Sequence, residues 1–104
     1  MVINYKVWHI RFENGTSTEL MRSDGTFALG VCDDDLCTIF LCDNLPDHLN
    51  ESVLCHELCH AFCFSYGLDL DIATEEIVAD FLATYGRDVF DVADEVLGRF
   101  ALIA

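Results

Sequence analysis

The chain has 104 residues and carries 19 acidic against 5 basic side chains, which gives a formal net charge of −14. Its length suits one domain spanning residues 1–104, and its 53% apolar content excludes a wholly disordered chain. The shortage of Lys and Arg argues against binding to nucleic acid or to anionic membranes, since both need basic side chains. Six cysteines occur without the features of an export signal at Met1–Lys6, so we expect reduced thiols and a cytoplasmic location.

Residues 1–45 are expected to form mainly strands. Residues 2–13 are rich in β-branched and aromatic side chains, and Asn14-Gly15 and Asp24-Gly25 predict tight turns. The acidic run Asp33–Asp35 predicts a polar turn. Further strands are predicted over residues 18–22, 26–32 and 37–42. The expected result is a small, mainly antiparallel sheet of three to four strands.

Residues 46–104 are expected to form about three helices. The first should begin between Pro46 and Asn50 and end at about Tyr66, because Gly67 can adopt the left-handed conformation that ends helices. A second should follow a cap at Asp71 or Thr74 and end near Gly86, and a third should span residues 88–101. Strands followed by helices predict an α+β fold, with the helices on one face of the sheet.

Apolar residues are distributed differently on the three predicted helices. The first has apolar or thiol side chains at almost every position around its axis, which predicts burial on all sides. The second is also expected to be buried, through Ile77, Val78, Phe81 and Leu82. The third has a single apolar stripe of Val89, Val92, Ala93, Val96, Leu97 and Phe100.

The strongest functional signal is the His-Glu-x-x-His sequence at residues 56–60. His56 and His60 are four residues apart, so both project from one face of the predicted helix and can bind one Zn²⁺ through ring nitrogens. Glu57 lies about 100° further round the helix and can reach a water at the metal from the side. Because the neighbouring residues are apolar, these polar side chains need compensating partners if they are buried. The pattern is typical of zinc peptidases, in which the glutamate is the general base.

A catalytic zinc site needs a third protein ligand and an open coordination position. No histidine follows the motif, and the residue six positions after His60 is Tyr66, so a carboxylate is expected. Glu75 and Glu76 both lie at the start of the next predicted helix, where an acidic residue also stabilises the helix dipole. Glu76 is favoured because Asp80, four residues on, would share its face and could accept the free ring N–H of a ligand histidine.

The cysteines fall into two groups, Cys32, Cys37 and Cys42, and then Cys55, Cys59 and Cys63. The second group forms one stripe on the predicted helix. Neither group has the Cys-x-x-Cys spacing of structural zinc modules, so packing in the core is expected for both. Thiols are nevertheless good zinc ligands, and a site made of Cys59 with His56 and His60 is the alternative.

Val53–Phe64 and Glu75–Ala83 together resemble the ImmA/IrrE family of small zincin-like metallopeptidases. The family has a His-Glu-x-x-His helix followed by a helix with Glu-x-x-Ala-(Asn/Asp), a pattern that Glu76–Asp80 matches. Upstream, Leu29-Gly30 and the strand predicted over Cys37–Cys42 resemble the family's strands before the active-site helix. The resemblance covers roughly residues 28–85.

The resemblance implies a zincin-like fold, with zinc on His56, His60 and Glu76 and with Glu57 as the base. Family members often come from phages, integrative elements or their bacterial hosts. Several cleave a helix-turn-helix repressor, so the resemblance implies a repressor-type regulatory protein as the substrate.

The expected function is therefore zinc-dependent peptide hydrolysis by a metal-activated water, the chemistry of a gluzincin-like metalloprotease acting on a protein or peptide. Tyr66, Tyr85 and His48 are candidate donors to the developing oxyanion, and the sequence does not choose among them. The alternative from another class is a zinc-containing interaction protein that binds a partner regulator without cutting it. A weaker alternative is another acyl hydrolase such as a deformylase, with Cys42 as a ligand, although the residues around Cys42 do not match.

Overall fold

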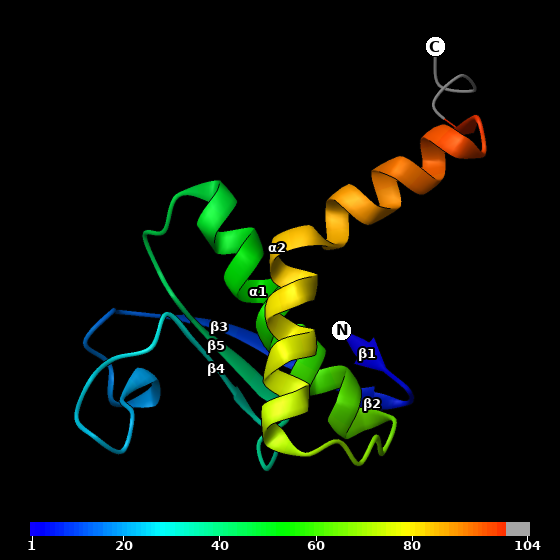
Figure 1. Ribbon diagram of the computed structural model, residues 1–104. Coiled ribbons are helices and arrows are strands. Elements are labelled where there is room, and N and C mark those ends of the chain that lie inside the picture. The colour runs from blue at the N-terminus through cyan, green and yellow to red at the C-terminus, as the bar shows by residue number, and fades with distance from the viewer. Residues whose placement is uncertain (100–104) are drawn as a thin grey trace.

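The computed structural model describes residues 1–99 and has an α+β architecture (Figure 1). The strands are β1 Val2–Ile3, β2 Lys6–Val7, β3 His9–Glu13, β4 Gly30–Asp33 and β5 Thr38–Cys42, with a 3₁₀-helix, η1, at Thr18–Leu20. Two α-helices follow, α1 at Asp47–Ser65 and α2 at Ile72–Val96. Helix α1 packs against β4 and β5, and α2 packs against α1. The strands thus precede the helices along the chain, as predicted.

The larger sheet has the order β3-β5-β4, with β5 in the middle. Strand β5 is antiparallel to β4 but parallel to β3, with His9 opposite Thr38. The prediction of a mainly antiparallel sheet is therefore wrong for one of its two strand pairs. After β3 the chain crosses to the opposite edge of the sheet and forms β4. It then returns to the middle, where β5 lies between β3 and β4. Local strand patterns do not encode this path. Because β5 lies between two strands and under α1, Ile39, Phe40 and Leu41 are almost fully buried.

The predicted strand over residues 2–13 is interrupted by a turn. Asn4 and Tyr5 have φ values of 47° and 67°, and they connect β1 to β2 in a small antiparallel hairpin. Two successive residues with positive φ are the geometry of a two-residue hairpin turn. Only His9–Glu13 joins the larger sheet.

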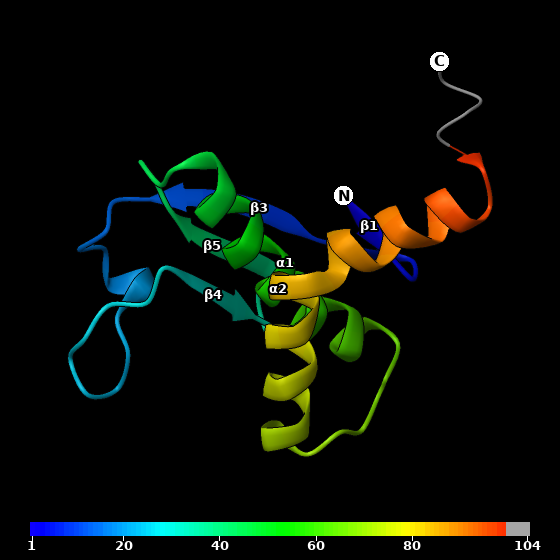
Figure 2. The same ribbon diagram turned by 45° about the horizontal axis from the view of Figure 1, so that its top comes forward.

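The segment between β3 and β4 contains less strand than predicted. In place of the predicted strand over 18–22, Thr18–Leu20 form η1, whose first turn is capped by the Ser17 side chain, and an isolated bridge joins Met21 to Phe27. The predicted strand over 26–32 is shortened to β4. In Figure 2 this light-blue and cyan segment projects beyond the end of the sheet.

Helix α1 has the predicted bounds. It follows Pro46, and it ends before Gly67, which has a φ of 63°. Its inner face is fixed to the first strands by Trp8, which is fully buried and donates from its ring nitrogen to Ser65 Oγ at 2.8 Å. The prediction of burial on all sides is wrong, because Phe62 is 47% exposed.

Helix α2 is longer than predicted. Asp71 caps it, accepting from the backbone N–H of Thr74 at 2.8 Å, and it continues through Gly86 to Val96. The third predicted helix is therefore part of α2 as far as Val96, and residues 97–99 follow the end of α2. Phe100 and Ala101 lie outside the described residues. Glycine within a helix is unfavourable by only about 1 kcal/mol relative to alanine, too little to end a long helix. Figure 1 instead shows a bend between the yellow and orange parts of α2.

Much of the apolar surface of α2 faces solvent, contrary to the predicted burial. Ile77 is 69% exposed and Phe81 is 54% exposed, because α1 packs along only one face of α2. The orange second half extends away from the sheets (Figures 1 and 2), and Val89, Val92, Val96 and Leu97 are exposed there. Within residues 1–99, no helix combines the length and the apolarity needed to cross a membrane.

Candidate metal centre

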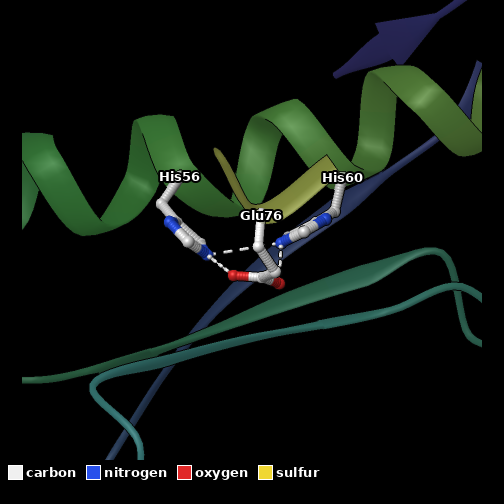
Figure 3. Close-up of side chains that lie close together, drawn as sticks. All are labelled: His56, His60 and Glu76. Atoms are coloured by element: carbon white, nitrogen blue, oxygen red, sulfur yellow. Dashed lines mark hydrogen bonds and ion pairs between the residues drawn. The ribbon is translucent and has the colours of Figure 1, made fainter. Parts of the chain in front are cut away.

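Two helices bring His56, His60 and Glu76 together (Figure 3). Both imidazole rings project from α1 toward the carboxylate of Glu76, which α2 supplies from its first turns. The two Nε2 atoms are 3.3 Å apart. Glu76 Oε2 lies 3.2 Å from His56 Nε2, and Glu76 Oε1 lies 3.0 Å from His60 Nε2. Three potential ligand atoms therefore converge on one point.

The other ring nitrogen of each histidine lies against a second carboxylate. His56 Nδ1 is 2.9 Å from Asp80 Oδ1, and His60 Nδ1 is 2.7 Å from Glu75 Oε2. An ionised carboxylate only accepts hydrogen bonds, so each Nδ1–H donates to its carboxylate. A neutral imidazole with its proton on Nδ1 has a free lone pair on Nε2. This tautomer can bind a metal through Nε2.

The donor set fits a zinc ion. Ligand atoms about 2.0–2.1 Å from a tetrahedral centre lie roughly 3.3 Å from one another. The distances of 3.0, 3.2 and 3.3 Å among the two Nε2 atoms and the Glu76 oxygens are close to that value. The lone pairs of the two Nε2 atoms and of the Glu76 carboxylate repel one another at these distances. The arrangement is therefore stable only with positive charge among these atoms, from protons on the imidazoles or from a divalent cation. Two imidazoles and one carboxylate leave a fourth position open, as catalytic zinc sites require.

Glu57 lies beside this cluster in an enclosed position. It is 8% exposed, and burial raises the pKa of its carboxyl group. The neighbouring His56 and His60 oppose that rise in pKa, while the negative charge of Glu76 adds to it. A general base works best when its pKa is close to the working pH. The raised pKa of Glu57 therefore suits a general base better than the ordinary pKa of an exposed glutamate would.

Two pockets lie along α1, between β4 and α2, and share Glu57 at their borders; we name them the larger and the smaller half of the cleft. The larger half, about 540 Å³, is bordered by Arg22, Gly30, Ser52, Val53, His56, Asp80 and Thr84, among others. The smaller half, about 280 Å³, is bordered by Cys32, Asp34, His60, Ile72, Glu75 and Glu76. Glu57 borders both halves. A ligand that occupied both halves would lie across Glu57, beside the three converging side chains.

Close approach of β4 to α1 forms the floor of this cleft, and Gly30 permits it. A Cβ atom at Gly30 would lie 2.6 Å from Val53 Cγ1 and 3.1 Å from Glu57 Cγ. Both separations are shorter than ordinary van der Waals contacts, so any larger residue would displace α1 or β4 next to the glutamate.

Replacing Gly30 by Ala should lower the free energy of unfolding by about 1–3 kcal/mol through this overlap. The added methyl group meets a branched side chain, so the double variant Gly30→Ala/Val53→Ala should recover part of the loss. Urea denaturation measures both effects. Gly15→Ala is the control, because a Cβ there meets only Cys42 Sγ, at 3.3 Å. Equal stability of Gly30→Ala and Gly15→Ala would show that the close approach is unimportant.

The cysteines lie in different environments, and all six are free thiols. Cys59 and Cys63 are buried in a cluster with Ala79, as the core-packing prediction requires, and burial raises the pKa of the Cys63 thiol to about 11. Within the described chain, the side chains that converge as potential metal ligands do not include Cys59. Cys32 packs against the core and also borders the smaller half of the cleft.

The three candidate oxyanion donors are not brought to the site. His48, Tyr66 and Tyr85 are all exposed, and in the described part of the chain none of them borders either half of the cleft. The hydroxyl groups that do border it are those of Ser52 and Thr84, in the larger half. Neither is predicted from the sequence, because isolated Ser and Thr residues on helices carry no recognisable signal.

Sequence reasoning also missed the role of Glu75. Because consecutive helical residues are about 100° apart, Glu76 reaches Nε2 of His60 while Glu75 reaches Nδ1 of the same ring. Asp80 occupies the corresponding position on His56. The signal that could have identified this arrangement is the pairing of two acidic residues with a third acid four positions later on one helix.

Comparisons with protein-family models, with curated proteins and with solved structures found no match to this chain.

Proposed function

We propose that the protein is a zinc-dependent metallopeptidase with a zincin-like arrangement, related to the ImmA/IrrE family. The observation that carries this proposal is the convergence of His56 Nε2, His60 Nε2 and the Glu76 carboxylate beside the buried Glu57. His56, His60 and Glu76 would hold the zinc, with the two Nδ1 atoms fixed by Asp80 and Glu75.

Zinc, when bound, would increase the acidity of water and polarise the scissile carbonyl group. Glu57 would take the proton from the attacking water as the new C–O bond forms and the carbonyl π bond opens to an oxyanion. Glu57 would then deliver that proton to the amine nitrogen, and the C–N bond would break as the carbonyl group re-forms. The burial of Glu57 limits competition from bulk solvent for that proton. Asp80 and Glu75 hold the histidine rings in position throughout the reaction.

The substrate is proposed to be a protein or peptide bound in the cleft, with a repressor-type regulator as the class suggested by the family resemblance. Nucleic acid is a poor candidate, because the net charge of −14 repels phosphates. Six free thiols are compatible with a reducing compartment such as the cytoplasm.

The test is metal analysis combined with a cleavage screen. We expect the purified chain to bind one zinc ion and to cut members of a pooled peptide mixture, with products identified by mass spectrometry. Removal of zinc by a chelator should abolish cleavage, and added zinc should restore it. Failure to bind zinc would contradict the metal site, whereas one bound zinc without cleavage would favour an interaction protein.

Replacing Asp80 by Ala should weaken zinc binding by about 10–100-fold, because His56 loses the acceptor that fixes its ring and tautomer. The affinity can be measured by competition with a chromophoric chelator. Asp88→Ala removes the same charge from an exposed position on the same helix, and it should leave the affinity unchanged. A similar loss in both variants would indicate a general effect of charge.

A further inference from the structure

The two halves of the cleft differ in the charged side chains at their borders. Asp34 and Glu75 border the smaller half, on the side of His60. Arg22 borders the larger half and is the only basic side chain, apart from the histidines, among the residues lining either half. A ligand that occupies both halves would therefore meet carboxylates in each of them and a guanidinium group in the larger half alone.

Arg22 differs from the other basic residues in its contacts. Arg11 pairs with Glu13, Arg87 with Glu51 and Arg99 with Asp94, while Lys6 lies over the ring of Phe64. Within residues 1–99, no carboxylate oxygen lies within 4.0 Å of the Arg22 guanidinium group. Its hydrogen bond, to Thr26 Oγ1, is long at 3.4 Å. Asp24, in the same turn, has a carboxyl group whose pKa is lowered by hydrogen bonds from Thr26 and also by the charge of Arg22, but Asp24 and Arg22 form no ion pair. The guanidinium donors not used by Thr26 are therefore available to a ligand.

The acidic groups in the same half of the cleft do not compete strongly for Arg22. Asp80 is engaged by Nδ1 of His56, and Glu57 lies buried against β4. A guanidinium group binds a carboxylate through two parallel hydrogen bonds, a geometry that neutral side chains do not reproduce. In a chain of net charge −14, an unpaired arginine at a cleft also offsets the general repulsion of anionic ligands.

We propose that Arg22 binds a carboxylate of the peptide substrate on the side of the scissile bond that occupies the larger half of the cleft. This inference rests on the proposed peptidase function and names its substrate class: peptides with an acidic group on that side. The carboxylate can be an Asp or Glu side chain or the C-terminus of the peptide, and the experiment separates these two sources.

The first part of the test compares matched pools of peptides. The first pool has free C-termini and contains Asp and Glu. The second pool has the same sequences with amidated C-termini, and the third has free C-termini but Asn and Gln in place of Asp and Glu. If the C-terminus is bound, amidation should lower kcat/KM about tenfold; if a side chain is bound, the Asn/Gln pool should show that loss. Arg22→Gln should lower cleavage of the pools that carry the recognised carboxylate by the same factor and leave unchanged the pool that lacks it.

Two further variants control for charge. Arg22→Glu should shift preference toward peptides with Lys or Arg at the same position. Arg11→Gln removes one positive charge from β3, the sheet edge away from the cleft, and it should not alter the preference. Equal effects of Arg22→Gln on all pools, or no effect, would overturn the proposal.

The second part does not depend on cleavage. In ¹⁵N NMR spectra of the zinc-loaded wild-type protein, the Arg22 side-chain Nε–Hε resonance should shift on titration with the first pool. It should not shift with a fourth pool, which is amidated and also has Asn and Gln in place of the acids. If the wild type cuts no peptide but this shift occurs, the peptidase function fails while the Arg22 site stands. If no shift occurs with any pool, the Arg22 site is wrong even if peptides are cut.

Discussion

Replacing Glu57 by Gln should lower the rate of peptide hydrolysis by roughly 10²–10⁴-fold while the protein keeps its zinc. The amide has the size of the carboxylate and fits the same enclosed position, where the side chain is 8% exposed. It cannot take a proton from water at neutral pH, so the step that generates the attacking group is lost. The measurements are kcat/KM for a peptide from the cleavage screen and zinc content by elemental analysis.

Glu51→Gln is the matched control for this variant. Glu51 lies on the same helix, is exposed and pairs with Arg87 at the surface, where such a pair contributes little to stability. Its replacement should change neither zinc content nor kcat/KM appreciably. Wild-type activity in Glu57→Gln would contradict the assigned role, and so would loss of zinc in that variant, because Glu57 is not among the converging ligand atoms.

The same variant separates the peptidase from the alternative interaction protein. A protein that only binds a regulator should retain partner binding in Glu57→Gln, since the metal ligands are unchanged. A peptidase should instead accumulate a complex with uncut substrate. Comparing complex formation with substrate turnover therefore distinguishes the two functions in one preparation.

The parts of the fold that could be predicted are those set by local signals. Helix α1 has its predicted bounds because Pro46 and Gly67 act through the backbone alone, whatever the rest of the chain does. The cap at Asp71 is local in the same sense. The turn at Asp33–Asp35 is another local feature: Asp33 accepts from the backbone N–H of Leu36 at 3.0 Å.

The parts that could not be predicted depend on contacts between distant segments. Parallel pairing of β3 with β5 is decided by the route of the chain around β4, which strand composition does not contain. The burial of α2 was overestimated because its apolar residues allow burial but do not require it. Ile77 and Phe81 remain exposed on the face of α2 away from α1.

The candidate site shows the same division. The spacing of His56, Glu57 and His60 fixes their relative directions on one helix, so the sequence was sufficient to group them. The sequence favoured Glu76 over Glu75 but could not show that both reach His60, on its two ring nitrogens, because that depends on how α2 crosses α1. Arg22 lies in a loop far from the motif in sequence, and only the fold brings it to the cleft.

Replacing Glu76 by Ala should weaken zinc binding on the order of 10³-fold, whereas Glu75→Ala should weaken it by about 10–100-fold. The difference follows from the atoms each glutamate approaches. Glu76 lies 3.0 and 3.2 Å from the two Nε2 atoms, where the ion would be held, while Glu75 lies 2.7 Å from Nδ1 of His60 and acts only through that ring. Zinc affinity can be measured by competition with a chromophoric chelator.

Circular dichroism of both variants without metal should match that of the wild type, since both side chains lie in the first turns of a helix whose cap is Asp71. Glu75→Ala, when saturated with zinc, should retain measurable hydrolysis, because the ligand set is intact. Glu76→Ala should not regain the wild-type rate even in excess zinc, because the ion loses both a ligand and its alignment with Glu57. The reverse order of affinities would identify Glu75 as the ligand, and equal retention of zinc by both variants would eliminate a carboxylate ligand from α2.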